Sequence, residues 1–359
     1  MVVDDGQLPS RPVTRTPLAA SPFLAACRGE DTSHRPVWFM RQAGRSLPEY
    51  RALRAKHAFQ ELITDAAVTA EVTLQPVRRH GVDAAILFSD IITPAQSIVP
   101  GISIETGRGP IIEQPFRTLA DVDRLRAYEP SRDIPYVIEA VQRCVAELDP
   151  LGVPLIGFAG APFTVATYLV EGGKSKEFET TKAMMRADPE TWTALLDALA
   201  DIALATLRAQ VQAGASAVQL FDSWAGILSE ADYRRFVMPS SARILHGLAD
   251  LGVPRIHFGV GTGELLGAMG EAGADVVGVD WRVALTDARR RVASGKALQG
   301  NLDPVALLAP WPVVEQEVGR VLDDADAAGG GHIFNLGHGV LPQTDPTVLT
   351  RVVEMVHGR

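Results

Sequence analysis

Short apolar runs alternate along the chain with longer segments in which apolar residues recur at helical spacing. The runs are rich in Val, Ile and Phe, and their continuous hydrophobicity is typical of strands buried on both faces of a parallel sheet. The intervening segments are long enough for the crossover helices that parallel strands need. The runs cover residues 36–40, 84–90, 154–160, 217–223, 254–260, 274–280, 297–303 and 332–339.

The helical segments carry start and stop signals. The longest begins at "DPETW", where Asp188 is a capping residue and Pro189 suits the first turn. Several helices end in a glycine-containing turn before the next strand, as in "HGVDA", "LGVP", "AGAS" and "AGAD". About eight βα units predict an α/β protein with a single (β/α)8 TIM barrel. From periodicity alone, the alternative is a doubly wound open sheet.

The segment from residue 91 to 150 is long for one βα connection. Within it, "SIVPGISIETGRGPIIEQPF" predicts a hairpin or loop inserted after the second strand, followed by helices. Residues 1–20 are polar and proline-rich, and we expect them to form a disordered N-terminal arm. No change of composition divides the rest, so residues 21–359 are expected to form one catalytic barrel domain.

Composition narrows the class of protein. The 359 residues carry a formal charge of -9, and 47% of them are apolar. The absence of a dense Lys/Arg stripe argues against nucleic acid as a partner. The most apolar helical stretch contains Asp197 and Asp201, and no basic-then-apolar leader is visible, so we expect a soluble cytoplasmic protein without membrane contact. Cys27 and Cys144 have no partner Cys or His nearby, which argues against a CxxC zinc or redox motif.

Polar residues gather where the runs end, while the middles of the runs stay apolar. A barrel places its active site at the carboxyl ends of its strands, so this distribution predicts an enzyme. The strand-end candidates are Arg41, Asp90, Tyr168, Ser223, His257, Asp280, Asn301, Asp303 and His338.

Arg41 and Arg45 stand together after the first run of an acidic chain. Gly44 and Pro48 argue against a continuous helix there, so a loop is expected in which two guanidinium groups converge. Arginine suits a bidentate grip on carboxylates. The pair is therefore either a local site for an anionic ligand or two surface arginines paired with neighbouring acids.

The other candidates also have structural alternatives. Asp90 is either a cap for the next turn or a functional acid, and Tyr168 either packs in the core or lines the site. His338 lies between two glycines, which permit close approach of a ligand or simply a turn. Ser223 lacks a GxSxG elbow, so a hydrogen-bonding role is favoured over a nucleophilic one. "FGVGTGELLG" does not fit a dinucleotide-binding motif, because Glu264 replaces the third glycine.

Two long segments and five shorter ones together resemble one known family. "PVWFMRQAGRSLPEYR" (36–51) and "GFAGAPFTVATYLVEGG" (157–173) resemble the two signatures of the uroporphyrinogen decarboxylases. "LFSDI", "LFDSWAG", "VVGVDW", "LQGNLDP" and "FNLGHG" are similar to further blocks of that family, in the same order. The resemblance spans residues 36 to about 346. One departure is Ser46, which occupies a place usually held by tyrosine, and there we expect altered loop packing.

The resemblance implies a (β/α)8 barrel, usually a homodimer, that removes CO2 from the four acetate arms of uroporphyrinogen III. The product would be coproporphyrinogen III in haem and tetrapyrrole biosynthesis, and the family needs no metal or organic cofactor. Catalytic roles carry over to Asp90 and Arg41. The substrate-binding residues implied in the same way are Arg41, Gln42, Ala43, Gly44, Arg45, Asp90, Tyr168, Ser223 and His338.

The proton donor of such a reaction stays open at this stage. Arg41 is a candidate by position, but a guanidinium group is a weak acid. A carboxylic acid of the substrate, or a water held by the arginines, is the competing donor. Two other functions remain as alternatives. One is a zinc- and corrinoid-dependent methyltransferase of related fold, which would need His and Cys ligands. The other is a porphyrin-binding protein without catalysis.

Overall fold

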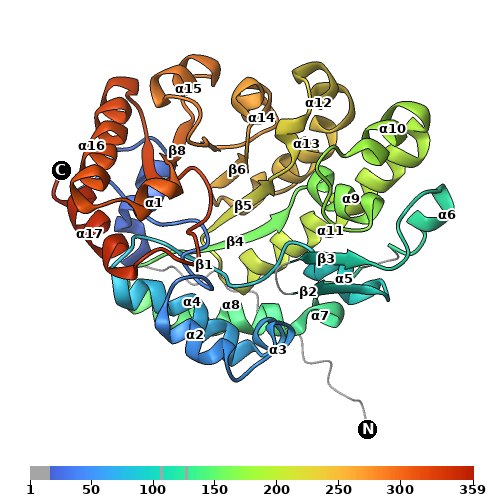
Figure 1. Ribbon diagram of the computed structural model, residues 1–359, viewed down its shortest axis with the longest axis horizontal. Coiled ribbons are helices and arrows are strands. Elements are labelled where there is room, and N and C mark those ends of the chain that lie inside the picture. The colour runs from blue at the N-terminus through green and yellow to red at the C-terminus, as the bar shows by residue number, and fades with distance from the viewer. Residues whose placement is uncertain (1–16, 106–107, 126–127) are drawn as a thin grey trace, which may run out of the picture.

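The computed structural model describes residues 17–105, 108–125 and 128–359. Seven parallel strands form one curled sheet in the order β1-β4-β5-β6-β7-β8-β9, and helices surround it (Figure 1). This order follows the chain without reversal, whereas a doubly wound sheet reverses at its switch point. The strands are β1 (Ala85–Ile86), β4 (Leu155–Gly160), β5 (Ala217–Asp222), β6 (Arg255–Gly259), β7 (Val276–Gly278), β8 (Ala297–Leu302) and β9 (His332–Leu336). Seven of the eight runs are thus confirmed as strands.

The remaining run, residues 36–40, forms only an isolated parallel bridge between Val37 and Phe334 of β9. The Phe334 N–H donates to the Pro36 carbonyl at 2.9 Å, and the Trp38 N–H donates to the Phe334 carbonyl at 3.3 Å. On its other side, the Val37 carbonyl accepts from the Asp83 N–H at 2.9 Å. This run therefore lies between β9 and the segment that leads into β1.

The helices alternate with the strands. Local signals account for several boundaries: Asp188 accepts from the Thr191 N–H at 3.1 Å at the start of α11, as predicted, and Gly81 ends α4 in the left-handed region with φ 67°. The α-helices are α1 (Pro22–Cys27), α2 (Pro48–Arg54), α3 (Phe59–Thr64), α4 (Ala66–His80), α5 (Thr93–Ile98), α6 (Leu119–Val122), α7 (Pro130–Asp133), α8 (Pro135–Leu148), α9 (Pro162–Glu171), α10 (Glu179–Ala187), α11 (Pro189–Ala213), α12 (Glu230–Phe236), α13 (Met238–Gly247), α14 (Leu266–Glu271), α15 (Leu285–Arg291), α16 (Trp311–Ala328) and α17 (Pro346–His357).

Between β1 and β4, a two-stranded antiparallel hairpin forms from β2 (Ile102–Glu105) and β3 (Gly109–Ile112). It is joined to the end of α9, because the Ile112 N–H donates to the Gly172 carbonyl at 3.0 Å. The Phe116 N–H likewise donates to the Leu169 carbonyl at 2.9 Å. These bonds hold the hairpin over one side of the sheet, where it contributes a wall of the cavity described below.

Three polar side chains beneath the cavity are joined by hydrogen bonds. Trp38 Nε1–H donates to Gln299 Oε1 at 3.0 Å, and Gln299 Nε2 donates to Gln219 Oε1 at 3.0 Å. All three side chains are buried. Nearer the cavity, Phe158 and Phe221 meet edge to face with centroids 5.5 Å apart. Rigid aromatic and hydrogen-bonded packing thus supports the cavity from beneath.

At the amino end, residues 1–16 of the expected N-terminal arm lie outside the described residues, and Pro17–Ala20 form a short 3-10 helix. Cys27 and Cys144 are both buried free thiols. Among the described helices, none combines the length and the hydropathy required to cross a bilayer.

Candidate active site

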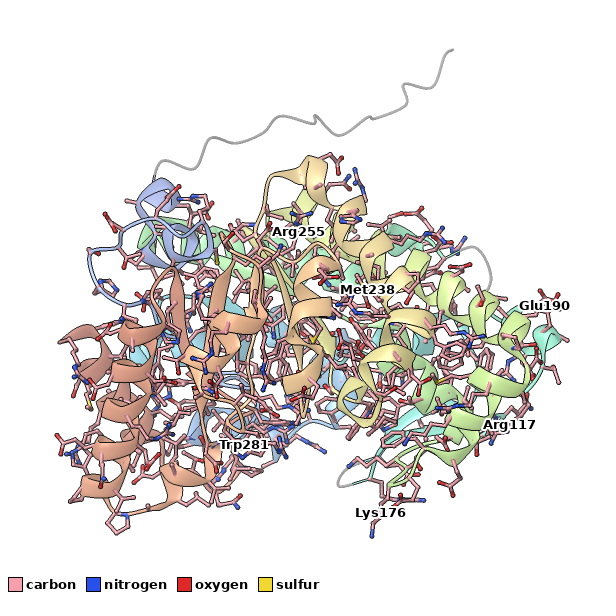
Figure 2. All side chains as sticks on the ribbon, turned by 90° about the horizontal axis from the view of Figure 1, so that it is seen from above. Arg117, Lys176, Glu190, Met238, Arg255 and Trp281 are labelled. Atoms are coloured by element: carbon pink, nitrogen blue, oxygen red, sulfur yellow. The ribbon has the colours of Figure 1, made fainter. Side chains whose placement is uncertain are left out.

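A cavity of about 470 Å³ opens at the carboxyl end of the sheet. Figure 2 shows the polarity of the molecule: Arg255, at the start of β6, lies toward one end, and Trp281, which follows β7, lies toward the other. The cavity is lined by Arg41, Ala43, Gly44, Arg45, Tyr50, Arg54, Phe59, Ile86, Leu87, Phe88, Ser89, Asp90, Ile91, Ile104, Glu105, Gly109, Pro110, Phe158, Tyr168, Lys174, Phe221 and Ser223.

The loop after residue 40 turns sharply so that its arginines reach this cavity. Arg41 has a left-handed backbone with φ 59°, and Gly44 has φ 80°. A Cβ on Gly44 would approach Phe88 Cδ2 to 3.0 Å and Cε2 more closely, so only glycine fits there. Gln42 points the other way: Oε1 accepts from the Phe39 N–H at 2.9 Å and Nε2 donates to the Ala84 carbonyl at 3.0 Å. Gln42 therefore fastens the loop, and the residues around it face the cavity.

Cations outnumber acids on the cavity wall. Four cationic side chains line it, against two carboxylates, in a chain whose formal charge is -9. Burial lowers the pKa of the Arg45 guanidinium, and the neighbouring charge of Arg41 lowers it further, while Tyr50 and Asp90 oppose the shift. Two guanidinium groups close enough for one to lower the pKa of the other favour binding of an anion between them.

Asp90 follows β1 and combines the two roles that the sequence left open. Its Oδ1 accepts from the Ile92 N–H at 3.0 Å, which caps the turn, and the same carboxylate faces the cavity. Burial raises the pKa of Asp90, and the Ile92 hydrogen bond and the charges of Arg41 and Arg45 oppose that rise. A carboxylate with little access to water interacts strongly with any N–H donor that a ligand presents to it.

Tyr168 comes from α9 and reaches the cavity beside Ser223. Its ring meets Trp224 at a centroid distance of 6.0 Å. Burial raises the pKa of the Tyr168 phenol, so the hydroxyl stays protonated and can donate a hydrogen bond at neutral pH. Thr164 of α9 joins this helix to the end of β5 and the loop that follows it. Its Oγ1 donates to Asp222 Oδ1 at 2.8 Å and accepts from the Trp224 N–H at 3.2 Å.

His338 lies beside Arg41 but is not among the residues that line the cavity. Burial, followed by the charges of Arg41, Arg45 and Arg282, lowers the pKa of His338 to about 4. Its Nδ1 accepts from the Gly339 N–H at 2.6 Å, so the proton of the neutral imidazole is on Nε2. His338 is thus a neutral hydrogen-bond donor near the arginine loop.

Seven of the nine substrate-binding candidates line this one cavity. They are Arg41, Ala43, Gly44, Arg45, Asp90, Tyr168 and Ser223, while Gln42 and His338 lie next to it. Two other strand-end candidates serve the framework instead. His257 is fully buried with Nε2 3.9 Å from Asp222 Oδ2, because it faces the helices while its neighbour Phe258 contacts Phe221. Asn301 Nδ2 donates to the Asp280 carbonyl at 2.9 Å.

Several lining residues were not identified from the sequence. Lys174 and Glu105 come from the loop after α9 and from the hairpin, so no strand end marks them. Phe158 and Phe221 lie within strands, where the pattern predicts only core. Ser46, the departure from the family pattern, is buried, and its hydroxyl has no hydrogen-bond partner among the described residues. Ser46 is not among the residues that line the cavity.

Comparison with known proteins gives a consistent result. The family model described as uroporphyrinogen decarboxylase (URO-D) matches residues 18–359. The uroporphyrinogen decarboxylase of Salinispora tropica is 61% identical over 354 residues, which cover 99% of this chain and 93% of that protein. That of Nocardia farcinica is 61% identical over 349 residues, covering 96% and 98%. A solved methyltransferase from Methanosarcina mazei has a TM-score of 0.78 at 18% identity, over 93% of this chain and 97% of that one, and this likeness shows the fold alone.

Proposed function

The chain belongs to the uroporphyrinogen decarboxylase family and is a decarboxylase, and we propose that its cavity removes the acetate carboxyl groups of uroporphyrinogen III as CO2. Four decarboxylations give coproporphyrinogen III, a step of haem and tetrapyrrole biosynthesis. The observation that carries the assignment of the site is the convergence of Arg41, Arg45 and Asp90 on one cavity.

The substrate is a flexible macrocycle that carries acetate and propionate arms on its rim and four pyrrole N–H groups at its centre. Arg41 and Arg45 are proposed to bind these carboxylates, since guanidinium groups bind carboxylates in bidentate fashion. Each such contact contributes about 1.5–3 kcal/mol where water is excluded. The local excess of cations offsets the repulsion that the acidic surface exerts on an anionic ligand.

Asp90 is proposed to accept hydrogen bonds from the pyrrole N–H groups. Direct loss of CO2 from an acetate arm would leave a poorly stabilised carbanion. Protonation of a pyrrole ring carbon first makes the ring an electron sink, and the pair of electrons from the breaking C–C bond then moves into the ring. The exocyclic methylene that results is protonated to a methyl group, and the ring carbon then releases the proton that it first took up, so that one proton replaces one molecule of CO2 overall. During the protonated stage the ring is cationic, so an ionised Asp90 stabilises the transition state more than the ground state.

Arg41 is proposed to position the reacting acetate arm for the group that protonates the ring carbon. Arg41 itself, a substrate carboxylic acid, and a water held by the arginines are the three candidates. Arg41 borders the cavity close enough to Asp90 and Tyr168 to influence the pKa of each. That position suits a residue that fixes the reacting acetate arm whichever group carries the proton.

Tyr168, Ser223 and His338 are proposed to orient the side arms as neutral hydrogen-bond donors. The raised pKa of Tyr168 and the lowered pKa of His338 support this role, because both shifts favour the uncharged form. Gln42 is proposed to contribute indirectly, through its hydrogen bonds to the Phe39 and Ala84 backbone, which hold the arginine loop in place. The proposed reaction uses no organic cofactor and no metal in any step.

The finer architecture belongs to the same proposal. Residues 36–40 would complete an eight-stranded (β/α)8 barrel between β9 and β1, with the β2–β3 hairpin as an insertion after the second strand. The hydrogen bonds of Pro36, Val37 and Trp38 support this closure. Residues 21–359 would then form one catalytic domain, expected to act in the cytoplasm as a homodimer.

The test is anaerobic incubation of the purified chain with reduced uroporphyrinogen III, followed by mass spectrometry. We expect stepwise loss of four molecules of CO2, and we expect EDTA to leave the rate unchanged. A carrier protein would bind the tetrapyrrole without releasing CO2. That result, or loss of activity that zinc restores, would refute the proposed reaction.

A further inference from the structure

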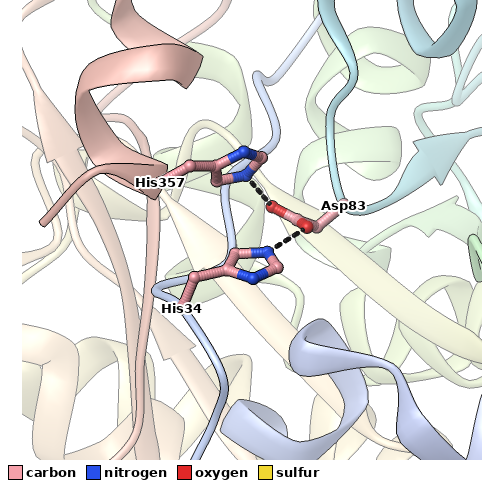
Figure 3. A group of neighbouring side chains, drawn as sticks. All are labelled: His34, Asp83 and His357. Atoms are coloured by element: carbon pink, nitrogen blue, oxygen red, sulfur yellow. Dashed lines mark hydrogen bonds and ion pairs between the residues drawn. The ribbon is translucent and has the colours of Figure 1, made fainter.

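A second cluster of ionisable side chains lies at the opposite end of the sheet from the cavity. His34, Asp83 and His357 come together there, as Figure 3 shows. Asp83 precedes β1, whereas Asp90 of the catalytic cavity follows it. The cluster joins the segment before residue 36, the approach to β1 and the last residue of α17. It is therefore separate from the groups assigned to decarboxylation.

The three side chains present a ligand set with a compact geometry. His34 Nε2 lies 2.7 Å from Asp83 Oδ1, and His357 Nε2 lies 2.8 Å from Asp83 Oδ2. All three ligand atoms lie within 4.8 Å of one another. Ligands at about 2.0–2.1 Å around a tetrahedral zinc ion stand roughly 3.4 Å apart. Small side-chain movements would thus open the cluster around a metal ion.

Neighbouring groups hold these ligands in place. The Val37 N–H donates to Asp83 Oδ2 at 2.7 Å, which fixes the orientation of the carboxylate. Ser33 Oγ lies 3.2 Å from His34 Nδ1, where it can accept the proton that a metal-bound imidazole carries on that nitrogen. The side chains of His34 and His357 are 29% and 30% exposed, so water can reach a fourth coordination position.

We propose that His34, Asp83 and His357 form a site for one divalent cation of the zinc class. Two imidazoles and one carboxylate suit zinc and its first-row neighbours better than magnesium or calcium, which prefer oxygen ligands. Binding replaces the two hydrogen bonds to Asp83 with three metal–ligand bonds, and each Nε2 that ligates the ion carries no proton. The ion would connect residues that are far apart in the chain, and so stabilise the fold without entering the decarboxylation.

The test uses the full chain, stripped of metal with a chelator and titrated with zinc chloride by calorimetry at neutral pH. We expect one zinc ion per chain and a rise in the temperature of unfolding when zinc is added. Cobalt(II) in place of zinc should give visible absorption bands that its free aquo ion lacks. Acidification should weaken binding, because a ligating imidazole must be unprotonated.

The variants His357→Gln and His34→Gln each remove one ligand from a different element. Each should weaken zinc binding about tenfold or more and abolish the thermal shift, because even loss of an outer-shell partner of a ligand costs about 10–100-fold in metal affinity. His57→Gln is the matched control, because His57 is an exposed histidine that pairs instead with Glu61 at 3.6 Å. Two variants are used so that a folding defect in one does not decide the result.

Three outcomes would overturn the metal site: no zinc binding, binding that both glutamine variants retain, or binding that the control loses. In each case His34, Asp83 and His357 would form a hydrogen-bonded cluster that is not a metal site. Zinc-free and zinc-loaded protein should decarboxylate uroporphyrinogen at the same rate. The outcome of this test is thus independent of the outcome for the proposed reaction.

Discussion

The side chain of Arg41 packs directly against Gly339. A Cβ on Gly339 would come within 2.7 Å of Arg41 Cγ, and closer still to its Cδ. The glycine after His338 therefore determines where the first arginine of the site can lie. A residue outside the cavity wall controls the position of a residue within it.

Gly339→Ala should displace Arg41 while leaving the fold intact. Loss of one charge-assisted contact of about 1.5–3 kcal/mol corresponds to a fall in kcat/KM of roughly ten- to a hundredfold. Steady-state kinetics measure this change. Gly319→Ala in α16 is the matched control, because its Cβ would meet nothing nearer than 3.8 Å, and it should keep wild-type kinetics. Equal kinetics for the two variants would contradict the role given to Gly339.

Asp90→Asn should separate activity from stability. Turnover should fall by about a hundredfold or more, the usual effect of removing a preorganised electrostatic group. The folded protein raises the pKa of Asp90, so its ionised form disfavours folding at neutral pH, and this penalty disappears as the pH falls through the raised pKa. Asparagine can still accept the Ile92 hydrogen bond, so the unfolding temperature at pH 7 should stay equal or rise.

Glu105→Gln serves as the control for Asp90, because Glu105 is the other carboxylate on the cavity wall and its side chain is 46% exposed. It should lower turnover only slightly. Near-normal turnover in Asp90→Asn, or a comparable loss in Glu105→Gln, would remove Asp90 from its proposed place in catalysis.

Lys174→Met should weaken binding of the anionic substrate at the cavity rim. An exposed ionic contact contributes about 0.2–1 kcal/mol, so KM should rise by roughly two- to fivefold at low ionic strength. The effect should shrink as salt is added. Lys176→Met, two residues away and outside the cavity lining, is the matched control. KM values that respond equally to both substitutions would attribute the effect to net charge and not to the site.

Thr164→Val should destabilise the protein and loosen the loop that carries Ser223. Valine keeps the shape of threonine but leaves the fully buried Asp222 carboxylate without its 2.8 Å hydrogen bond. The unfolding free energy should fall by about 1–3 kcal/mol, as measured by chemical denaturation. Thr167→Val, which loses only a bond to the Thr164 carbonyl of its own helix, should cost less. Equal costs would show that Asp222 does not depend on this bond.

His332 should make the fold sensitive to acid. Nε2–H donates to the Gly300 carbonyl at 2.8 Å, Nδ1 accepts from Arg35 at 3.0 Å, and burial lowers the pKa of His332 to about 3. The unfolded chain takes up this proton near pH 6.5, and the folded chain does not. This contribution to stability is therefore complete above pH 6.5 and is lost as the pH falls toward 3.

Denaturation curves at several pH values test this directly. His332→Gln should have a lower free energy of unfolding than the wild type at pH 7. On acidification, that free energy should fall less steeply than in the wild type, by up to about 1.4 kcal/mol per pH unit. His80→Gln should behave similarly between pH 6.5 and 4, because burial lowers the pKa of His80 to about 4. Stability curves parallel to that of the wild type would show that neither histidine is responsible.

The strands could be predicted from the sequence because a strand buried on both faces is a continuous run of apolar residues. Such a run is visible in a few consecutive residues, without any knowledge of distant contacts. Continuous apolar runs predicted β4 to β9, and a polar residue at a run's end predicted Asp90. The same rule misplaced His257, which lies in the middle of β6 and does not line the cavity. Which face of the sheet such a residue takes depends on the register of the strand.

By itself, the sequence determined the alternation of strands and helices, the arginine loop with its glycine, and the family. These follow from local patterns, in which each residue acts on near neighbours in the chain. Tertiary structure alone decided that Lys174 joins the cavity, that Gly339 supports Arg41, and that His34, Asp83 and His357 meet. Such contacts join residues far apart in sequence, and only the packing of the whole chain brings them together.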